Sequence, residues 1–241
     1  MKVKLISCTP DLLNLLYTAC RTCYNAGTPT DMLADIDEIS NEKKLKLLNK
    51  VFKRGHLSTS EHSQFTFAIE GVSRAFLAQI SRHRLMSLSV QSQRYVEFKE
   101  SFDTISELFE NPKTDKDEEY LISIANKYFV DVNKDNYRMY IQALLSYLLS
   151  IKLGNKPEDA RMFLPNATKT NMILTCNLRE LMHLCNLRLC SCAQLEIRTV
   201  MNLMVKEVLE KYPWLKEYLV PKCEITGYCR EEKSCGRKPK L

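Results

Sequence analysis

The 241-residue chain is 45% hydrophobic and 27% charged, a composition typical of globular proteins with a substantial core. This excludes collagen-like, disordered and small disulfide-bonded proteins, and no apolar run approaches the ~20 residues of a membrane span. The net charge of +6 is mild, and residues 222–241 alone carry six cationic and three acidic side chains, so the rest of the chain does not require a nucleic-acid partner.

The hydrophobic pattern predicts one mixed α/β domain over residues 1–220, followed by a basic tail with cysteines over 221–241. Strands are expected at residues 2–7, 65–70, 95–99 and 171–176. Helices are expected at residues 11–24, 41–54, 73–83, 117–152, 178–189 and 192–211. Asp11 and Ser73 are expected to cap two of them, residues 131–136 to divide the longest, and residues 25–41 to form a polar loop.

The six glycines exclude two classes of phosphate-binding loop. No two of them lie close together, whereas a dinucleotide fingerprint and a Walker loop both need closely spaced glycines. Anionic ligands must therefore be bound by side chains and helix N-termini. Arginine suits this task best, because it stays charged and presents a planar fork to phosphate or carboxylate.

Polar and titratable side chains concentrate in residues 56–94. Three of the four histidines lie between His56 and His83, and residues 82–94 alternate cations, hydroxyls and amides. One interpretation is a solvated basic turn at a helix end, where cations complement the helix dipole. The other is a binding segment in which Ser92 and Gln93 hydrogen-bond the edge of a heterocycle.

A second dense region covers residues 160–165 and 177–188. Arg179 and His183 are four positions apart on one predicted helix and share a face, whereas Arg188 points elsewhere. The plain alternatives are that Arg179 pairs with a surface carboxylate and that His183 is a satisfied core histidine.

The cysteines give weaker signals. Cys20 and Cys23 have the spacing of a redox or metal pair but lie within a predicted helix, which favours two packed thiols. Cys223, Cys229 and Cys235 recur every six residues, and three thiolates with one more ligand would hold zinc tetrahedrally. This spacing matches no standard zinc ribbon, so no metal site is predicted.

Residues 82–94 resemble the signature of the flavin-dependent thymidylate synthase family. That signature is Arg-His-Arg, two residues, Ser, four residues, Ser, one residue and Arg, and every fixed position is matched by Arg82-His83-Arg84, Ser87, Ser92 and Arg94. Further matching segments follow in order over most of residues 1–213, among them Gly55-His56, Ser73-Arg74, Gln79, Ala160-Arg161, Asn177-Leu178-Arg179, Leu187-Arg188 and Ala193-Gln194-Leu195-Glu196-Ile197.

The resemblance implies an α/β (α+β) fold with a mixed, mainly antiparallel sheet packed with helices. It implies a homotetramer with FAD held between subunits, and no nucleic-acid or membrane partner. The implied enzyme, a methyltransferase, converts dUMP to dTMP with carbon from methylenetetrahydrofolate and reducing equivalents from NADPH. The family histidine beside the flavin is matched by His56, and Arg188 would polarise the pyrimidine electrostatically.

The resemblance also assigns ligand contacts by position. FAD would contact Ser58, Arg82, His83, Arg84, Leu85, Asn177, Arg179 and His183. The substrate dUMP would contact Gln79, Arg82, Gln91, Ser92, Gln93, Arg94, Arg161 and Arg188. One position departs from the family: a Glu or Gln often stands two residues before the second motif serine, where this chain has Val90. Either Gln91 takes over through a local shift, or one hydrogen bond is absent.

Two further expectations concern the alternatives and the compartment. The ordinary thymidylate synthase uses a cysteine nucleophile after proline, and this chain has no Pro-Cys pair. The competing hypothesis from another class is a basic nucleic-acid-binding protein that uses residues 82–94 and the tail. The first ten residues lack the long apolar centre of a secretory signal, and ten cysteines suit a reducing compartment, so we expect a cytoplasmic protein.

Overall fold

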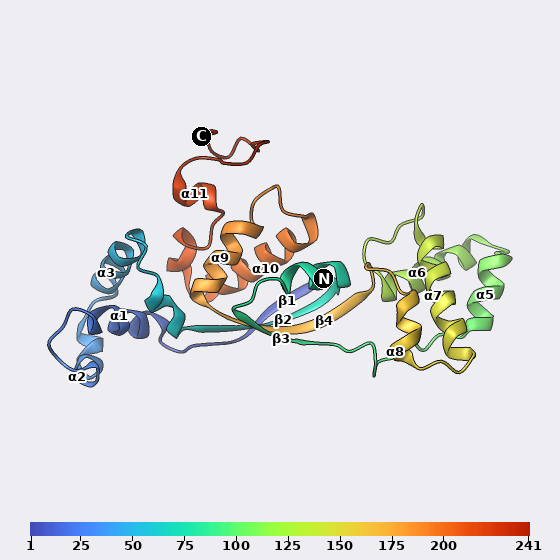
Figure 1. Ribbon diagram of the computed structural model, residues 1–241, viewed down its shortest axis with the longest axis horizontal. Helices are drawn as coiled ribbons and strands as arrows, with labels where there is room; N and C mark the ends of the chain where they lie inside the picture. Colours follow the sequence, from blue (N-terminus) through green and yellow to red (C-terminus); the bar gives the residue numbers. More distant parts are fainter. The chain divides into compact units, whose positions relative to one another are not determined.

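The computed structural model describes residues 1–241, which form two compact units (Figure 1). The first unit comprises Met1 and residues 69–82 and 89–172, and the second comprises residues 2–68, 83–88 and 173–241. No helix is both long enough and apolar enough to cross a bilayer.

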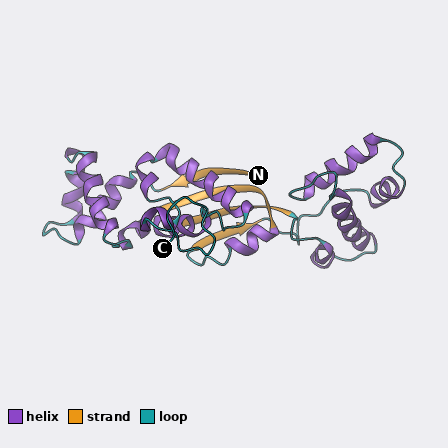
Figure 2. Cartoon of the chain, turned by 90° about the horizontal axis from the view of Figure 1, so that it is seen from above, coloured by secondary structure: helices purple, strands orange, loops and turns teal.

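Four strands form one sheet in the order β1-β2-β4-β3, drawn in orange in Figure 2. Their bounds are Lys2–Cys8 for β1, Gln64–Ser73 for β2, Met86–Val90 for β3 and Lys169–Asn177 for β4. β2 and β4 run antiparallel, because the hydroxyls of Thr66 and Thr175 lie 3.0 Å apart while Gly71 N donates to Asn171 Oδ1 at 2.9 Å. The expected α/β class with an antiparallel sheet is confirmed.

Alternation of apolar and polar residues explains β2 and exposes one wrong prediction. Phe65, Phe67 and Ile69 are fully buried, as their spacing predicts. The strand expected at residues 95–99 does not form, and the fourth strand is β3, where half-buried Met86, Leu88 and Val90 alternate with exposed serines. This alternation is difficult to recognise in the sequence, because it covers only five residues and cations and amides flank it on both sides.

The second unit holds six α-helices. They are α1 (Leu12–Thr22), α2 (Pro29–Ala34), α3 (Asn41–Lys53), α9 (Leu178–Arg188), α10 (Leu195–Lys211) and α11 (Lys222–Thr226). α1 packs on α3, and α10 packs on β1. The predicted loop over residues 25–41 is wrong in part: Thr28 caps α2 and Pro29 opens it. Asp11 precedes α1 in a left-handed conformation without capping it, contrary to expectation.

The first unit contains a helical core. Its helices are α4 (Arg74–Ile80), α5 (Phe102–Glu110), α6 (Asp115–Tyr128), α7 (Tyr137–Lys152) and α8 (Pro157–Ala160). The predicted break near residues 131–136 is confirmed, since it separates α6 from α7. Ser73 caps α4 as expected, with its Oγ accepting from Phe76 N at 2.9 Å, although α4 ends at Ile80. Leu121 and Leu144 are fully buried where α5, α6 and α7 meet.

Candidate active site

In the second unit, helix α9 displays the polar residues of the candidate site. Asn177 caps the helix, because its Oδ1 accepts from Glu180 N at 2.9 Å. Arg179 and His183 are exposed, as their four-residue spacing on one face suggested, while Glu180 is buried. Arg188 ends the helix in a half-buried position. The helix therefore points different polar groups into the core and toward solvent.

Glu180 and Arg188 of α9 form a polar chain with His83, in which Glu180 and His83 are buried and Arg188 is half-buried. The Nε of Arg188 donates to His83 Nε2 at 3.1 Å, and His83 Nδ1 lies 3.8 Å from Glu180 Oε1. Since Nε2 accepts a hydrogen bond, neutral His83 carries its proton on Nδ1, facing the carboxylate. His83 therefore orients the Arg188 guanidinium, and Glu180 supports His83 from the other side.

The electrostatics keep His83 neutral. Burial, which is the largest cause, and the charges of Arg188 and His183 together lower the pKa of His83 from 6.5 to about 4. Burial also raises the pKa of Glu180, an effect that His183 opposes. The ligand atoms of His83, Glu180 and His183 lie within 4.8 Å of one another. Because Nε2 of His83 accepts from Arg188, its proton lies on Nδ1 beside Glu180, and a metal ion bound there would have to displace that proton.

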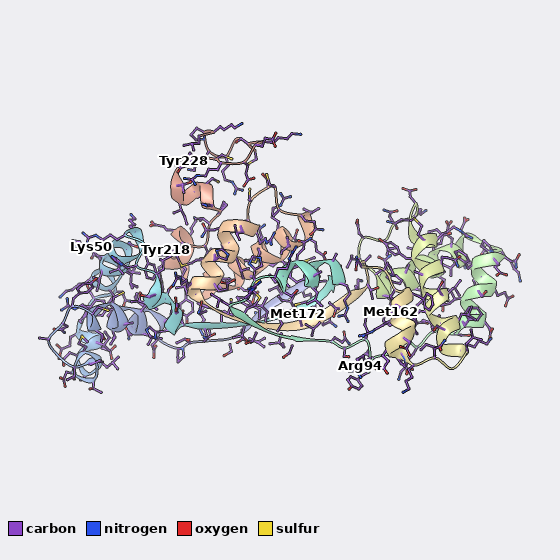
Figure 3. All side chains as sticks on the ribbon, in the orientation of Figure 1. Lys50, Arg94, Met162, Met172, Tyr218 and Tyr228 are labelled. Atoms are coloured by element: carbon purple, nitrogen blue, oxygen red, sulfur yellow. The ribbon has the colours of Figure 1, made fainter.

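A cavity of about 660 Å³ opens beside α9 in this unit. Its polar lining consists of Lys53, Arg179, His183 and Asn186 together with the carboxylates of Glu217 and Glu224. Leu57 and Tyr218 contribute apolar surface, and Tyr218 is labelled in Figure 3. This volume lies within the range of small-molecule and cofactor sites. Arg179 also forms an exposed ion pair with Glu61, which is the plain alternative that the sequence left open.

The first unit has its own polar recess, of about 300 Å³. Gln91, Ser92 and Gln93 line it after the end of β3, together with Arg74 and Lys169. The Gln91 side chain accepts from Asn171 Nδ2 at 2.9 Å, and its carbonyl accepts from Arg74 Nη2 at 3.0 Å. The side chain of Gln91 therefore supplies an amide beside Val90, the position at which the sequence departs from the family.

Positive charge accumulates near this recess. The Nε of Arg74 is buried with no hydrogen-bond partner, and burial together with the charge of Arg161 lowers the pKa of Arg74. Arg161 donates only to the carbonyl of Glu158 through its Nε, at 3.0 Å, whereas Arg94 pairs with the carboxylate of that residue at 2.9 Å. The unpaired Nε of Arg74 and the neighbouring charge of Arg161 together favour binding of an anion.

The structure divides the expected site residues into two groups. All expected FAD contacts except Arg82 belong to the second unit, and all expected dUMP contacts except Arg188 belong to the first. Arg82, Arg84, Ser58 and His56 are exposed, Leu85 is 68% exposed, and Gln79 is half-buried on α4.

Sequence reasoning did not single out Glu180, Asn186, Arg74 or Lys169 as site residues. For Arg74, a usable signal was its place directly after the helix-capping Ser73. No local signal marks Glu180, since its significance comes from a partner 97 positions earlier in the chain, His83.

Comparison with known proteins decides the family. A family model described as "Thymidylate synthase complementing protein" matches residues 4–214. The flavin-dependent thymidylate synthase of Nitratidesulfovibrio vulgaris is 39% identical over 99% of this chain and 95% of its own length. That of Clostridium tetani is 36% identical over 100% of this chain and 95% of its own. The chain belongs to the flavin-dependent thymidylate synthase family.

Solved structures agree with this assignment. A crystal structure of thymidylate synthase X from Helicobacter pylori with FAD and dUMP has a TM-score of 0.72 and 28% identity to this chain, and the match covers 91% of this chain and 99% of the other. The family resemblance seen in residues 82–94 is therefore confirmed, and the similarity extends over nearly the whole chain. Family membership supports the enzyme hypothesis and gives no support to the nucleic-acid-binding alternative.

Proposed function

We propose that this chain converts dUMP to dTMP, taking the carbon from methylenetetrahydrofolate and the reducing equivalents from NADPH through bound FAD. The observation that carries the proposal is the polar chain of Glu180, His83 and Arg188. In it, the neutral His83 accepts a hydrogen bond from the charged Arg188 guanidinium and so fixes its orientation. An enzyme that must stabilise negative charge on a pyrimidine ring needs such a preorganised cation.

The second unit fits a flavin. Its cavity of about 660 Å³ combines apolar surface with the donors of Lys53, Arg179, His183 and Asn186, which suits a ring system joined to a diphosphate, while Glu217 and Glu224 line the cavity as well. The family signature assigns further flavin contacts to Ser58, His83, Arg84, Leu85 and Asn177 in this unit, and to Arg82, the last residue of its segment of the first unit. His56 belongs with these as the expected residue beside the ring. Asn177 also caps α9, so it would act through both its side chain and the position of the helix.

The first unit fits a nucleotide monophosphate. Ser92, Gln93 and Arg94 follow β3, and Arg161 lies close enough to Arg74 to lower its pKa. We assign the phosphate to Arg94, Arg161 and Ser92, and the remaining polar contacts to Gln79, Arg82, Gln91 and Gln93. Arg74 and Lys169 would add positive charge at the recess without being part of the family signature.

The catalytic contribution of this chain is electrostatic and positional. Arg188 would stabilise the negative charge that develops on the uracil ring, and the neutral His83 would fix its orientation without competing for that charge. Glu180 lies on the Nδ1 side of His83, at 3.8 Å, where its carboxylate favours the tautomer that the Arg188 hydrogen bond requires. Ser92 is assigned to binding, because its Oγ accepts from Arg94 N at 3.1 Å and no base is placed to activate it.

The assembly and the compartment belong to the same proposal. Arg188 and the remaining dUMP residues belong to different units, and a homotetramer would let one subunit complete the site of another. All ten cysteines are free, which agrees with a reducing cytoplasm.

Purification with spectroscopy and an activity assay tests the proposal. The purified protein is expected to be yellow, to release FAD on denaturation, and to form dTMP from dUMP only when methylenetetrahydrofolate and NADPH are both added. A colourless protein that forms no dTMP and binds DNA with a steep salt dependence would support the nucleic-acid-binding alternative instead.

A further inference from the structure

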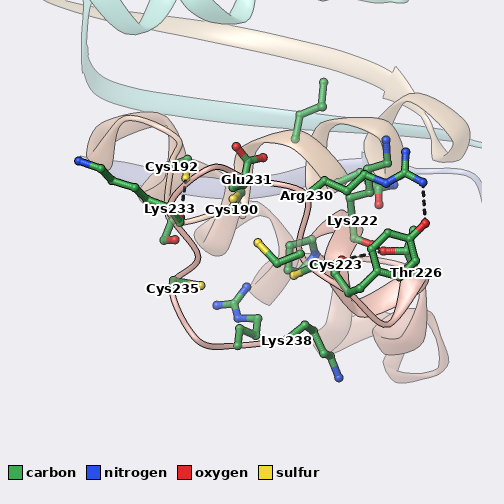
Figure 4. Close-up of a pocket in the computed structure, with 17 residues that line it drawn as sticks. Cys190, Cys192, Lys222, Cys223, Thr226, Arg230, Glu231, Lys233, Cys235 and Lys238 are labelled. Carbon is green, nitrogen blue, oxygen red and sulfur yellow. Dashed lines mark hydrogen bonds between the residues drawn. The ribbon is translucent and has the colours of Figure 1, made fainter. Parts of the chain in front are cut away.

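Five cysteines from two distant segments line one pocket of about 190 Å³ next to the end of α9. Cys190 and Cys192 follow the helix, while Cys223, Cys229 and Cys235 come from the tail. Figure 4 shows labelled cysteines of both segments around the same space. The spacing of the three tail cysteines offered no fourth ligand for a metal ion. The fold places two candidates, Cys190 and Cys192, beside them.

The tail is folded although it has almost no apolar core. Among residues 222–241, Cys229 is the one buried residue. Its backbone bonds to the end of the chain, with Cys229 N donating to Pro239 O at 2.7 Å and Leu241 N donating to Cys229 O at 2.9 Å. A segment of this size that buries so little apolar surface needs a cross-link or a metal to hold it, as small metal-dependent domains do.

We propose that Cys190, Cys192, Cys223 and Cys229 bind one Zn²⁺ ion as four thiolates and so fasten the tail to the end of α9. Zinc in structural sites takes four tetrahedral ligands with Zn–S distances near 2.3 Å. The pocket is wider than one ion, so the tail closes on the metal when it binds. Cys192 hydrogen-bonds to Cys190, and the Cys223 thiol lies near both Cys190 and Cys229. Cys235 is left out, because its thiol interacts with Ser191 and with Arg237 instead.

The charges around the pocket suit this ion. A zinc ion with four thiolates carries a net charge of −2. The pocket lining contains one carboxylate, Glu231, and five cations, which are Lys222, Arg230, Lys233, Arg237 and Lys238. This accounts for the concentration of positive charge in the tail.

The proposed zinc would stabilise a segment that adjoins the candidate active site. Cys190 is two residues beyond Arg188, the last residue of α9. A metal bond at Cys190 would therefore restrain the end of the helix that presents the guanidinium. The zinc is structural, and no step of the dUMP reaction passes through it.

Metal analysis of untagged protein, dialysed against a weak chelator, tests the proposal. We expect about one zinc per chain by inductively coupled plasma mass spectrometry. Cys190→Ser, Cys192→Ser, Cys223→Ser and Cys229→Ser should each lose most of it, while the matched control Cys235→Ser should keep it. Flavin absorbance and circular dichroism of each variant report whether the rest of the chain is folded.

A second measurement needs no variant. Titration of the wild-type protein with an organomercurial should release zinc to a colorimetric indicator, and limited proteolysis should cut the tail faster after release. Absence of zinc, iron in its place, a metal-free disulfide, equal zinc content in all five variants, or loss of zinc from Cys235→Ser would overturn the proposal.

Discussion

Protonation of His83 is expected to destabilise the protein as the pH falls from 6.5 toward 4. The pKa of this buried imidazole is lowered from 6.5 to about 4, so the unfolded chain binds the proton more tightly than the folded chain. The stability contribution is therefore complete above pH 6.5 and is lost as the pH decreases. At about 1.4 kcal/mol per pKa unit, the full loss is roughly 3 kcal/mol, of which about 2 kcal/mol has gone by pH 5.

The physical cause is specific to the site. A charged His83 can no longer accept the hydrogen bond from Arg188, and it would lie buried between that guanidinium and His183 with only Glu180 as a counter-charge. The measurement is the free energy of unfolding from urea titrations at several pH values between 8 and 5.

The comparison uses His83→Gln, which cannot titrate, and His62→Gln, which removes an exposed histidine. Between pH 8 and pH 5, the free energy of unfolding of the wild type and of His62→Gln should fall by about 2 kcal/mol more than that of His83→Gln. Equal losses in all three proteins would refute the reasoning.

Other predictions concern single side chains. Arg188→Ala should retain FAD but lower the rate of dTMP formation by roughly 10²-fold or more, because it removes the proposed charge stabilisation; an unchanged rate would exclude that role. Arg161→Ala should mainly raise the KM for dUMP in steady-state assays. If that KM does not change, Arg161 serves only its contact with Glu158. Asn177→Ala should lower the free energy of unfolding by about 1 kcal/mol through loss of the α9 cap, whereas Asn177→Asp should preserve it; no difference between the two would argue that capping is unimportant here.

Local sequence patterns predicted the elements whose periodicity is uninterrupted. β2 and α3 follow from the alternation of Phe65 with Phe67 and from a long amphipathic run. β3 was missed because only five residues carry its alternation, between segments rich in cations and amides. α2 was missed because a capping Thr28 with Pro29 occupies a stretch that is otherwise polar.

The amino-acid sequence by itself determined the chemistry that is present: a family signature rich in arginine and histidine, and ten cysteines without clustered glycines. Tertiary structure alone decided which of these groups act together. His83 and Arg188 are 105 positions apart yet share a hydrogen bond, and Cys190 meets tail cysteines more than thirty positions later. Periodicity describes neighbours within one helix or strand, whereas these partnerships depend on how separate elements pack. Burial then sets the pKa of His83, so its neutral state is a property of the fold.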